Sequence, residues 1–386
     1  MTTKELDSRY VANTYARFPV EIVRGKGSLA WDDAGKEYID MGTGIAVNTF
    51  GLADDEWVAA VTAQLGSFQH TSNLYYTAPC AQLAQMLCER TGMEKVFFGN
   101  SGAEANECAI KAARKWAQDR KGEEYYNIIT LKNSFHGRTL TTLAATGQDV
   151  FHTKFTPLTP GFLYADPADP DSLEALAADN KCAAVMFEAV QGEGGVLPLP
   201  SEFVEAMQRV AAEHDLLLIA DEVQVGNGRS GALYGYMNLG LEPDIVTTAK
   251  GLGGGLPVGA CLLGERVKDV LGPGDHGSTF GGNPAACAGA VNILSRLTDD
   301  VLAGVQERSE YIVSALSGAA GVKSVTGMGL MLGVETEKPA AEVVAACREN
   351  GVLVLTAKSK VRLLPALNIP FDLLEKAVAV LIAACA

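Results

Sequence analysis

Short apolar runs alternate with longer segments of helical period along most of the chain, and Gly, Asp or Asn bounds many of the runs. This alternation is typical of β-α-β units, in which helices cover a mostly parallel sheet. The helical segments include Ala105–Arg120 and Glu202–His214. We expect short strands at Val96–Phe98, Asn127–Leu131, Ala183–Phe187, Leu216–Ala220, Ile245–Thr248 and Ala260–Leu263.

The pattern changes after Gly289. A helical stretch continues through Leu316, and a closing apolar helix begins at Leu373. Between them, β-like segments are expected around Val322–Val325, Met331–Val334 and Val361–Leu364. The chain therefore predicts a large α/β domain at residues 51–288 and a smaller α+β domain after it.

The N-terminal segment is expected to join the smaller domain. Val20–Asp40 is rich in β-forming residues and has turn residues at 32–35. A segment this short cannot form a hydrophobic core alone, so it must pack on another part of the chain. We therefore assign residues 1–50 together with 289–386 to the small domain.

Composition and charge narrow the class of protein. The chain has 386 residues, of which 48% are hydrophobic and 20% charged, which excludes a disordered chain. No apolar run is long enough to span a bilayer, so no membrane protein is expected. The 31 basic and 46 acidic residues give a formal charge of −15, which disfavours binding to nucleic acid or to anionic lipid.

The cysteines and histidines predict neither a metal site nor a disulfide framework. The eight cysteines are scattered without a C-x-x-C pair, and the five histidines show no spacing typical of ligands. Residues 1–7 lack a basic patch followed by an apolar stretch, so we expect no secretory signal. We expect a cytoplasmic protein with reduced thiols.

Lys250 is the sharpest local candidate for chemistry. It ends an apolar strand and is followed by Gly251 and by three consecutive glycines, which let other groups approach its side chain closely. The end of such a strand points toward the crevice where open α/β sheets bind ligands. A partly desolvated lysine there can form a Schiff base with an aldehyde. A solvated surface lysine is the alternative.

Asp221 and Glu222 form a pair of carboxylates at the end of a fully apolar strand. A magnesium-binding role in nucleotide hydrolysis is disfavoured because the chain has no G-x-x-x-x-G-K-[ST] loop. A buried aspartate in this place can keep a pyridinium nitrogen protonated, which makes the ring an electron sink. A plain helix cap after the strand is the alternative for Asp221.

Two further strand ends carry candidate binding residues. Ser101, Gly102 and Ala103 open a long helix, whose free N–H groups favour an anion such as phosphate. Phe135 could stack on a flat cofactor, and Arg138 could bind a carboxylate through two hydrogen bonds. Plain helix capping, a core phenylalanine and a surface arginine are the alternatives.

The order of these features resembles the pyridoxal-phosphate enzymes of fold type I, the aspartate-aminotransferase-like fold. More closely, the chain is similar to the class III (ornithine-type) aminotransferases, and the similarity covers nearly its whole length. The segments that carry it are Asn100–Ala105, Phe135–Thr139, Ala220–Gln224, Thr248–Gly251 and His276–Pro284. The resemblance implies an α/β fold with a mostly parallel central sheet and a smaller α+β domain.

The resemblance also implies which residues hold pyridoxal 5′-phosphate. Lys250 would bind the cofactor covalently and carry protons as base and acid in turn. Asp221 would pair with the pyridinium nitrogen, Gln224 would contact the phenolic oxygen, and Phe135 would cover a face of the ring. The phosphate would lie at Ser101, Gly102 and Ala103, and Thr279 would reach the phosphate of a neighbouring subunit, which implies a homodimer with sites at the interface.

The substrate residues follow from the same resemblance. Arg138 would bind the carboxylate beside the reacting amine or keto group, and Arg362 a second carboxylate, as suits 2-oxoglutarate. Glu193 would mask Arg362 while the amine donor is bound. Ser278 and Tyr15 would also lie near the substrate.

Within the class, the chain looks most like bacterial acetylornithine aminotransferases of arginine biosynthesis. Residues 71–76 and 363–369 carry this likeness, and Gly44 stands where ornithine enzymes have an aromatic residue. The implied substrates are N2-acetyl-L-ornithine and 2-oxoglutarate, and the products are N-acetyl-L-glutamate 5-semialdehyde and L-glutamate. N-succinyl-diaminopimelate, ornithine and 4-aminobutyrate remain alternative donors. A non-catalytic binding protein is a remote alternative, because Lys250 and Asp221 are both present.

Overall fold

The computed structural model describes all 386 residues and is built on a seven-stranded central sheet. All six strands expected from the sequence belong to this sheet, and one further strand, β6, extends its edge. In spatial order, the sheet contains β4 (Lys95–Gly99), β12 (Gly259–Leu263), β11 (Ile245–Thr248), β10 (Leu217–Asp221), β7 (Cys182–Phe187), β5 (Asn127–Leu131) and β6 (Phe162–Ala165).

The sheet is mostly parallel, as the sequence predicts. β10 runs parallel to β7 and β11, and β5 runs parallel to β6 and β7. Only β12 is reversed, because it pairs antiparallel with both β11 and β4. The carboxyl ends of β4, β5, β7, β10 and β11 therefore lie at one edge of the sheet, together with the amino end of β12.

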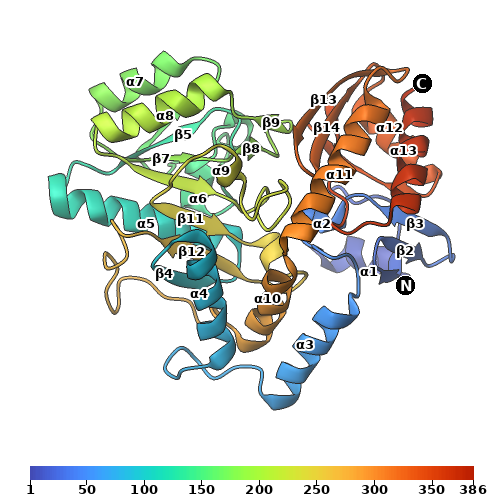
Figure 1. The fold of residues 1–386 in the computed structure, drawn as a ribbon, viewed down its shortest axis with the longest axis horizontal. Coiled ribbons are helices and arrows are strands. Elements are labelled where there is room, and N and C mark those ends of the chain that lie inside the picture. The colour runs from blue at the N-terminus through green and yellow to red at the C-terminus, as the bar shows by residue number, and fades with distance from the viewer.

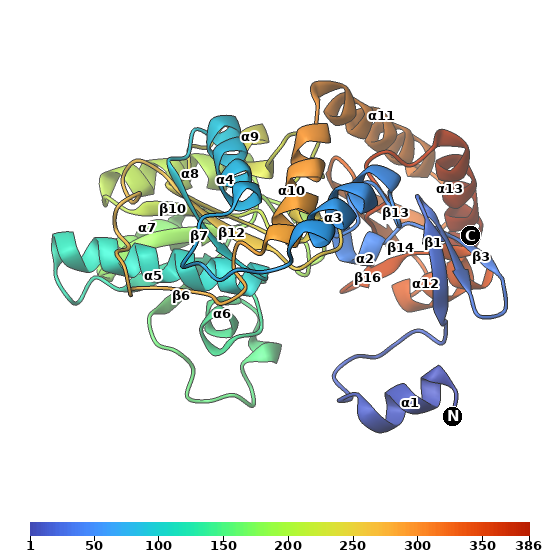
Figure 2. The ribbon, with the colours of Figure 1, turned by 90° about the horizontal axis from the view of Figure 1, so that it is seen from below.

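Helices cover both faces of the central sheet. In β10, Leu217 and Ile219 pack into the core beneath α5 (Gly102–Lys121), whereas Leu218 and Ala220 face the core that contains α8 (Ser201–Glu213). This alternation follows from the two-residue period of a strand. Figure 2 shows α5 on one side of the sheet and α4 (Ala78–Thr91) with α8 on the other. The α/β fold class is confirmed.

The N-terminal strands pack with the C-terminal part of the chain (Figure 1). β3 (Glu37–Asp40) pairs in parallel with β15 (Val352–Leu353), which completes a four-stranded sheet with β1 (Ile22–Lys26) and β2 (Leu29–Asp32). A second small sheet contains β13 (Val322–Met328), β14 (Met331–Thr336), β17 (Lys360–Leu363) and β16 (Leu355–Ala357). The division into two domains at residues 50 and 288 stays a prediction.

The prediction of one continuous helical stretch from Gly289 to Leu316 is wrong. The structure has two helices there, α10 (Pro284–Arg296) and α11 (Asp299–Leu316). The side chain of Thr298 accepts a hydrogen bond from the N–H of Val301 and so caps the start of α11. α10 packs on α3 (Asp55–Ser67) and α4, whereas α11 packs on α13 (Phe371–Cys385), so the break redirects the chain between two parts of the molecule.

The remaining elements are short or peripheral. α1 (Thr3–Tyr10) buries none of its residues and stands away from the rest of the chain (Figure 2). None of the helices combines the length and apolar character that a membrane span requires. The other elements are α2 (Thr43–Ala46), α6 (Leu140–Ala145), α7 (Pro170–Asp179), α9 (Gly235–Asn238), α12 (Ala340–Glu349), β8 (Val190–Gln191), β9 (Leu197–Pro198) and the single turns Asp149–Phe151 and Lys250–Leu252.

Candidate active site

A cavity of about 610 Å³ lies at the edge of the sheet where the carboxyl ends of the parallel strands meet. Open α/β sheets bind ligands at this edge, because the loops that follow several strands converge there. The loop before the reversed strand β12 closes one wall of the cavity. Its lining residues include Tyr15, Asn100–Ala103, Asn106, Phe135–Arg138, Glu188, Asp221, Gln224, Lys250 and 255–258.

Lys250 follows β11 and projects into this cavity. Its backbone φ is 44°, which lies in the left-handed region that costs a residue with a side chain conformational energy. Burial lowers the pKa of the Lys250 amine, although the negative charge of Glu193 acts in the opposite direction. The amine is therefore nearer to its neutral form, the form that attacks a carbonyl or accepts a proton.

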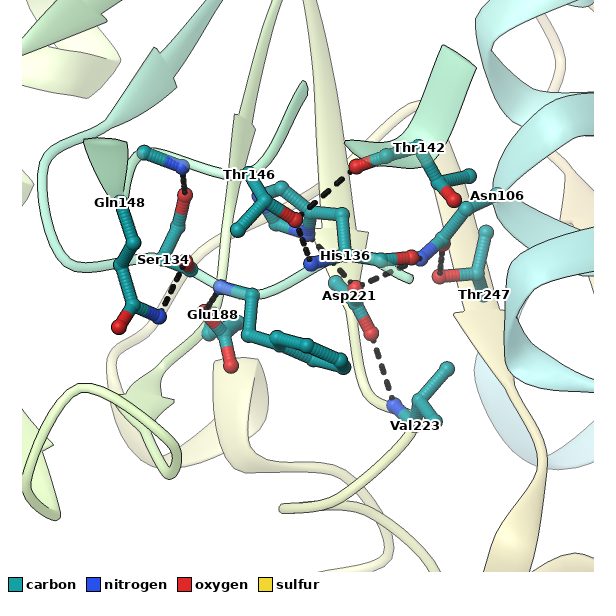
Figure 3. Close-up of polar contacts among 12 residues, drawn as sticks. Asn106, Ser134, His136, Thr142, Thr146, Gln148, Glu188, Asp221, Val223 and Thr247 are labelled. Atoms are coloured by element: carbon teal, nitrogen blue, oxygen red, sulfur yellow. Dashed lines mark hydrogen bonds and ion pairs between the residues drawn. The ribbon is translucent and has the colours of Figure 1, made fainter. Parts of the chain in front are cut away.

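Asp221 is held by hydrogen-bond donors at the carboxyl end of β10 (Figure 3). Its Oδ2 accepts hydrogen bonds from Nδ2 of Asn106 and Nδ1 of His136, both at 2.8 Å. Its Oδ1 accepts one from the N–H of Val223 at 3.1 Å. Asn106 is fixed in turn, because its Oδ1 accepts a hydrogen bond from Thr247 at 2.6 Å. The carboxylate is therefore fixed in the wall of the cavity before any ligand binds.

Glu222, the other member of the carboxylate pair, does not line the cavity. It is fully buried and accepts hydrogen bonds from the N–H groups of Gly235 and Tyr236, both at 2.8 Å. Burial raises the pKa of Glu222 to about 7, and these two N–H groups oppose the increase. The two neighbouring carboxylates thus have separate surroundings.

The raised pKa of Glu222 predicts a pH-dependent stability. Because the folded protein holds this proton more tightly than the unfolded chain, the free energy of unfolding should fall as pH rises from about 4.5 to about 7. The contribution of Glu222 is on the order of 3 kcal/mol. Glu222→Gln cannot titrate and should lack this part of the decrease. Urea unfolding of both proteins at pH 5 and pH 8 tests this, and a pH-independent difference between them would contradict it.

Phe135 and Glu188 form the neighbouring part of the wall. Oε2 of Glu188 accepts a hydrogen bond from the N–H of Phe135 at 2.9 Å. Burial, with the negative charge of Asp221, raises the pKa of Glu188 well above that of an ordinary glutamic acid. The Phe135 ring meets Phe151 edge to face at 6.0 Å, and the Arg138 guanidinium lies over Phe151 at 4.2 Å. Arg138 is itself exposed, so its charge stays available at the rim.

The start of α5 forms another part of the cavity wall. Ser101 caps the helix by accepting a hydrogen bond from the N–H of Glu104 at 3.2 Å. The N–H groups of Gly102 and Ala103 begin the helix and have no acceptor within it. A Cβ on Gly102 would lie 2.6 Å from Cγ1 of Val223, so only glycine allows this packing. Backbone N–H groups and the helix dipole together favour a phosphate here.

Glu193 and Arg362 form an ion pair beside the cavity. Nη1 of Arg362 lies 2.6 Å from Oε1 of Glu193, and the Arg362 side chain is only 3% exposed. Burial alone would raise the pKa of Glu193. The positive charge of Arg362 outweighs burial and holds this pKa below its usual range. Neither residue lines the cavity directly, whereas Gln224 contacts both and does line it. The expected pairing of Glu193 with Arg362 is present in the fold.

Three predicted residues lie at or beyond the rim. Tyr15 lines the cavity but is 70% exposed, on the N-terminal segment that follows α1. Ser278 lies outside the cavity, and its Oγ accepts a hydrogen bond from Nδ2 of Asn100 at 3.0 Å. Thr279 is exposed and is not brought to the cavity of its own chain.

Sequence reasoning missed three residues of the site. Glu188 directly follows the fully apolar strand β7, which is the same signal that drew attention to Asp221. Asn106 is a buried polar residue on the inner face of α5, and a polar side chain there needs a partner. His136 stands inside a segment already singled out, but only the fold brings it to Asp221.

Residues 10–385 match the family model of class-III aminotransferases. The chain is a class-III aminotransferase. It is 48% identical over 380 residues to a protein named acetylornithine aminotransferase from Haemophilus ducreyi, with 98% of this chain and 97% of the relative covered. The family expected from the sequence is confirmed.

Solved structures of related enzymes resemble the aminotransferase over nearly its whole length. An N-acetylornithine aminotransferase from Stenotrophomonas maltophilia is 36% identical, with a TM-score of 0.85, covering 98% of this chain and 97% of that chain. A Toxoplasma gondii ornithine aminotransferase, described with partial occupancy of pyridoxal phosphate at its active site, is 32% identical, with a TM-score of 0.93 and coverage of 99% and 93%. The aminotransferase fold is therefore confirmed.

The cavity of the aminotransferase fits pyridoxal 5′-phosphate. The start of α5 suits the phosphate, and the Phe135 ring offers a flat apolar surface. Asp221 is a buried carboxylate with donors on its inner side, which suits a positively charged ring nitrogen. Lys250 supplies an amine with a lowered pKa in the same cavity. The residues present thus match the phosphate, ring, ring nitrogen and aldehyde of this cofactor.

Proposed function

We propose that this aminotransferase moves the terminal amino group of N2-acetyl-L-ornithine to 2-oxoglutarate and uses pyridoxal 5′-phosphate as cofactor. The products are N-acetyl-L-glutamate 5-semialdehyde and L-glutamate. The observation that carries the chemistry is the presence of Lys250 and Asp221 in one cavity, beside the paired Glu193 and Arg362. The choice of donor is supported by the 48% identity to a protein of that name.

When bound, pyridoxal 5′-phosphate supplies an aldehyde for covalent attachment of amines and a ring that draws electrons from the attached carbon. The N–H groups of Gly102 and Ala103, with the Ser101 side chain, would bind its phosphate. Phe135 would cover the ring, and Gln224 would face its phenolic oxygen. These residues position the ring but exchange no proton.

Asp221 and Lys250 would do the proton chemistry. Asp221, anchored by Asn106 and His136, would hold a proton on the ring nitrogen. Lys250 would take a proton from the carbon that bears the donor amine and deliver it to the carbon on the other side of the nitrogen, the former aldehyde carbon of the cofactor, acting as base and then as acid. Its lowered pKa favours the neutral amine that the first of these steps requires.

The two arginines are best assigned in reverse of the sequence-based expectation. The amine of acetylornithine that reacts is far from its carboxylate, whereas 2-oxoglutarate has one carboxylate next to the keto carbon and one far from it. Arg362 is near enough to Lys250 for its charge to contribute to the lowered pKa of that amine, and Arg138 lies at the exposed rim. We therefore place the distant carboxylate of both substrates at Arg138 and the near carboxylate of 2-oxoglutarate at Arg362.

This assignment predicts unequal effects of two substitutions. Arg138→Ala should lower kcat/KM for both substrates, whereas Arg362→Ala should lower it chiefly for 2-oxoglutarate. Loss of a charge-assisted contact predicts decreases of about 10- to 100-fold. Half-reactions measured separately with donor and acceptor test this. An Arg362→Ala protein that loses more with the donor than with 2-oxoglutarate would refute the division.

Single-turnover spectra test the substrate. The cofactor-loaded protein is mixed with acetylornithine, ornithine, 4-aminobutyrate or N-succinyl-diaminopimelate, without 2-oxoglutarate. The visible band should disappear fastest with acetylornithine. If another donor is faster by about tenfold, corresponding to about 1.4 kcal/mol of transition-state preference, the aminotransferase chemistry stands but the proposed donor is wrong.

The protein is further proposed to be a homodimer in the cytoplasm. Leu74, Tyr75, Tyr76 and Phe280 are large apolar side chains with exposures of 86%, 71%, 108% and 60%, and Phe280 directly follows Thr279. A second copy packed here would cover them and could bring its Thr279 to the cavity of the first. Light scattering should give about twice the 40.6 kDa chain mass, and a monomer with full activity would exclude this arrangement.

A further inference from the structure

The side-chain amide of Gln224 joins the two members of the Glu193–Arg362 ion pair. Its Oε1 accepts a hydrogen bond from Nη1 of Arg362 at 3.0 Å. Its Nε2 donates to Oε1 of Glu193 at 3.3 Å. Because the arginine and the glutamate also contact each other at 2.6 Å, the three side chains form a closed ring of polar contacts.

The amide matches the charges of the closed pair. Its oxygen faces the cation and its N–H faces the anion, so each end contacts the group of complementary polarity. If Arg362 leaves Glu193 for a substrate carboxylate, these contacts cannot all survive. Release of Arg362 therefore costs its hydrogen bond to Gln224 in addition to the ion pair itself.

Gly192 leaves room for this amide. A Cβ on Gly192 would lie 2.4 Å from Oε1 and 2.7 Å from Cδ of Gln224. The backbone of Gly192 is not in the left-handed region, so its conformation alone does not require glycine. The close approach of the Gln224 amide, with Met331 on the same side, is what a larger residue would disturb.

Among the three side chains, only Gln224 lines the cavity. It is 6% exposed and shares the cavity wall with Asp221 and Lys250. Gln224 therefore links the cavity wall to an ion pair whose two members do not line the cavity.

We propose that Gln224 is a latch on the Glu193–Arg362 pair and thereby a specificity-determining residue. By holding the pair closed, Gln224 sets how readily Arg362 is released to bind a second carboxylate. It thereby sets the relative affinity for a donor with one carboxylate and an acceptor with two. This inference rests on the proposed role of Arg362 in binding the diacid. Gln224 acts through Arg362, as a positioning residue.

Binding of two inert acids to the cofactor-loaded protein tests the latch. Glutarate carries two carboxylates, and pentanoate is its five-carbon counterpart with one. Gln224→Leu removes both hydrogen bonds, and Gly192→Ala displaces the amide without changing its chemistry. Each variant should bind glutarate about three- to tenfold more tightly by titration calorimetry, and Gly192→Ala should leave the binding of pentanoate unchanged.

A third variant, Gln224→Glu, is expected to have the opposite effect on glutarate binding. Gln224→Glu places a second anion beside Arg362 and should weaken glutarate binding by about tenfold. A role in packing alone would change both acids in the same direction in every variant. Weaker or unchanged glutarate binding in Gln224→Leu and Gly192→Ala would overturn the latch. Arg362→Ala is the control: if it keeps the preference for glutarate over pentanoate, the proposed role of Arg362 fails instead.

Discussion

Replacing Lys250 with alanine is expected to lower turnover by about 10⁴-fold or more, because the only cavity lysine supplies both the covalent attachment and the proton transfer. Gly102, Ala103 and Asp221 remain in the variant, so the phosphate and ring sites persist. The variant should therefore still bind the cofactor, but noncovalently. The band of the attached cofactor should be lost, and borohydride should no longer fix the cofactor to the chain.

Lys268 provides the matched control. It lies on the surface, pairs with Glu94 and Glu265, and is absent from the cavity. Lys268→Ala should therefore keep both the visible band and the turnover. If Lys250→Ala retained cofactor that borohydride can fix to the chain, another amine would have to carry it and the assignment of Lys250 would be wrong.

Replacing Asp221 with alanine is expected to lower turnover by about 10³-fold or more, while cofactor stays bound. The physical reason is the loss of the negative charge that holds the ring nitrogen protonated. The attachment through Lys250 and the phosphate site at the start of α5 do not depend on that charge. The variant should keep a covalently attached cofactor, with a band shifted in position and in its pH dependence.

A substitution of the neighbouring carboxylate, Glu222, distinguishes the loss of the Asp221 charge from a general disturbance of the strand. Glu222 follows Asp221 but faces the N–H groups of Gly235 and Tyr236, away from the cavity. Glu222→Gln should therefore retain turnover at pH 7. Asp221→Asn provides a second comparison, because it keeps the shape of the side chain and removes its charge. Full activity in either Asp221 variant would contradict the proposed role of Asp221 in keeping the ring nitrogen protonated.

The strands and the motifs that follow them were accessible from the sequence for a local reason. The two-residue period of apolar side chains and the Gly, Asp or Asn at their ends are properties of short segments. Asn127–Leu131 and Ile245–Thr248 match the structure at both ends. The break between α10 and α11 was missed, because both helices have an apolar face and only the cap at Thr298 marks the join.

The sequence by itself determined the family, the mostly parallel sheet and the residues that stand after its strands, including Lys250, Asp221 and Phe135. These depend on order along the chain. Only the tertiary structure decided which side chains meet across long separations: His136 and Asn106 at Asp221, and Gln224 between Glu193 and Arg362. Such contacts depend on how layers pack, because the pairing of β3 with β15 and the convergence of strand ends are set by burial of the whole core rather than by any local pattern.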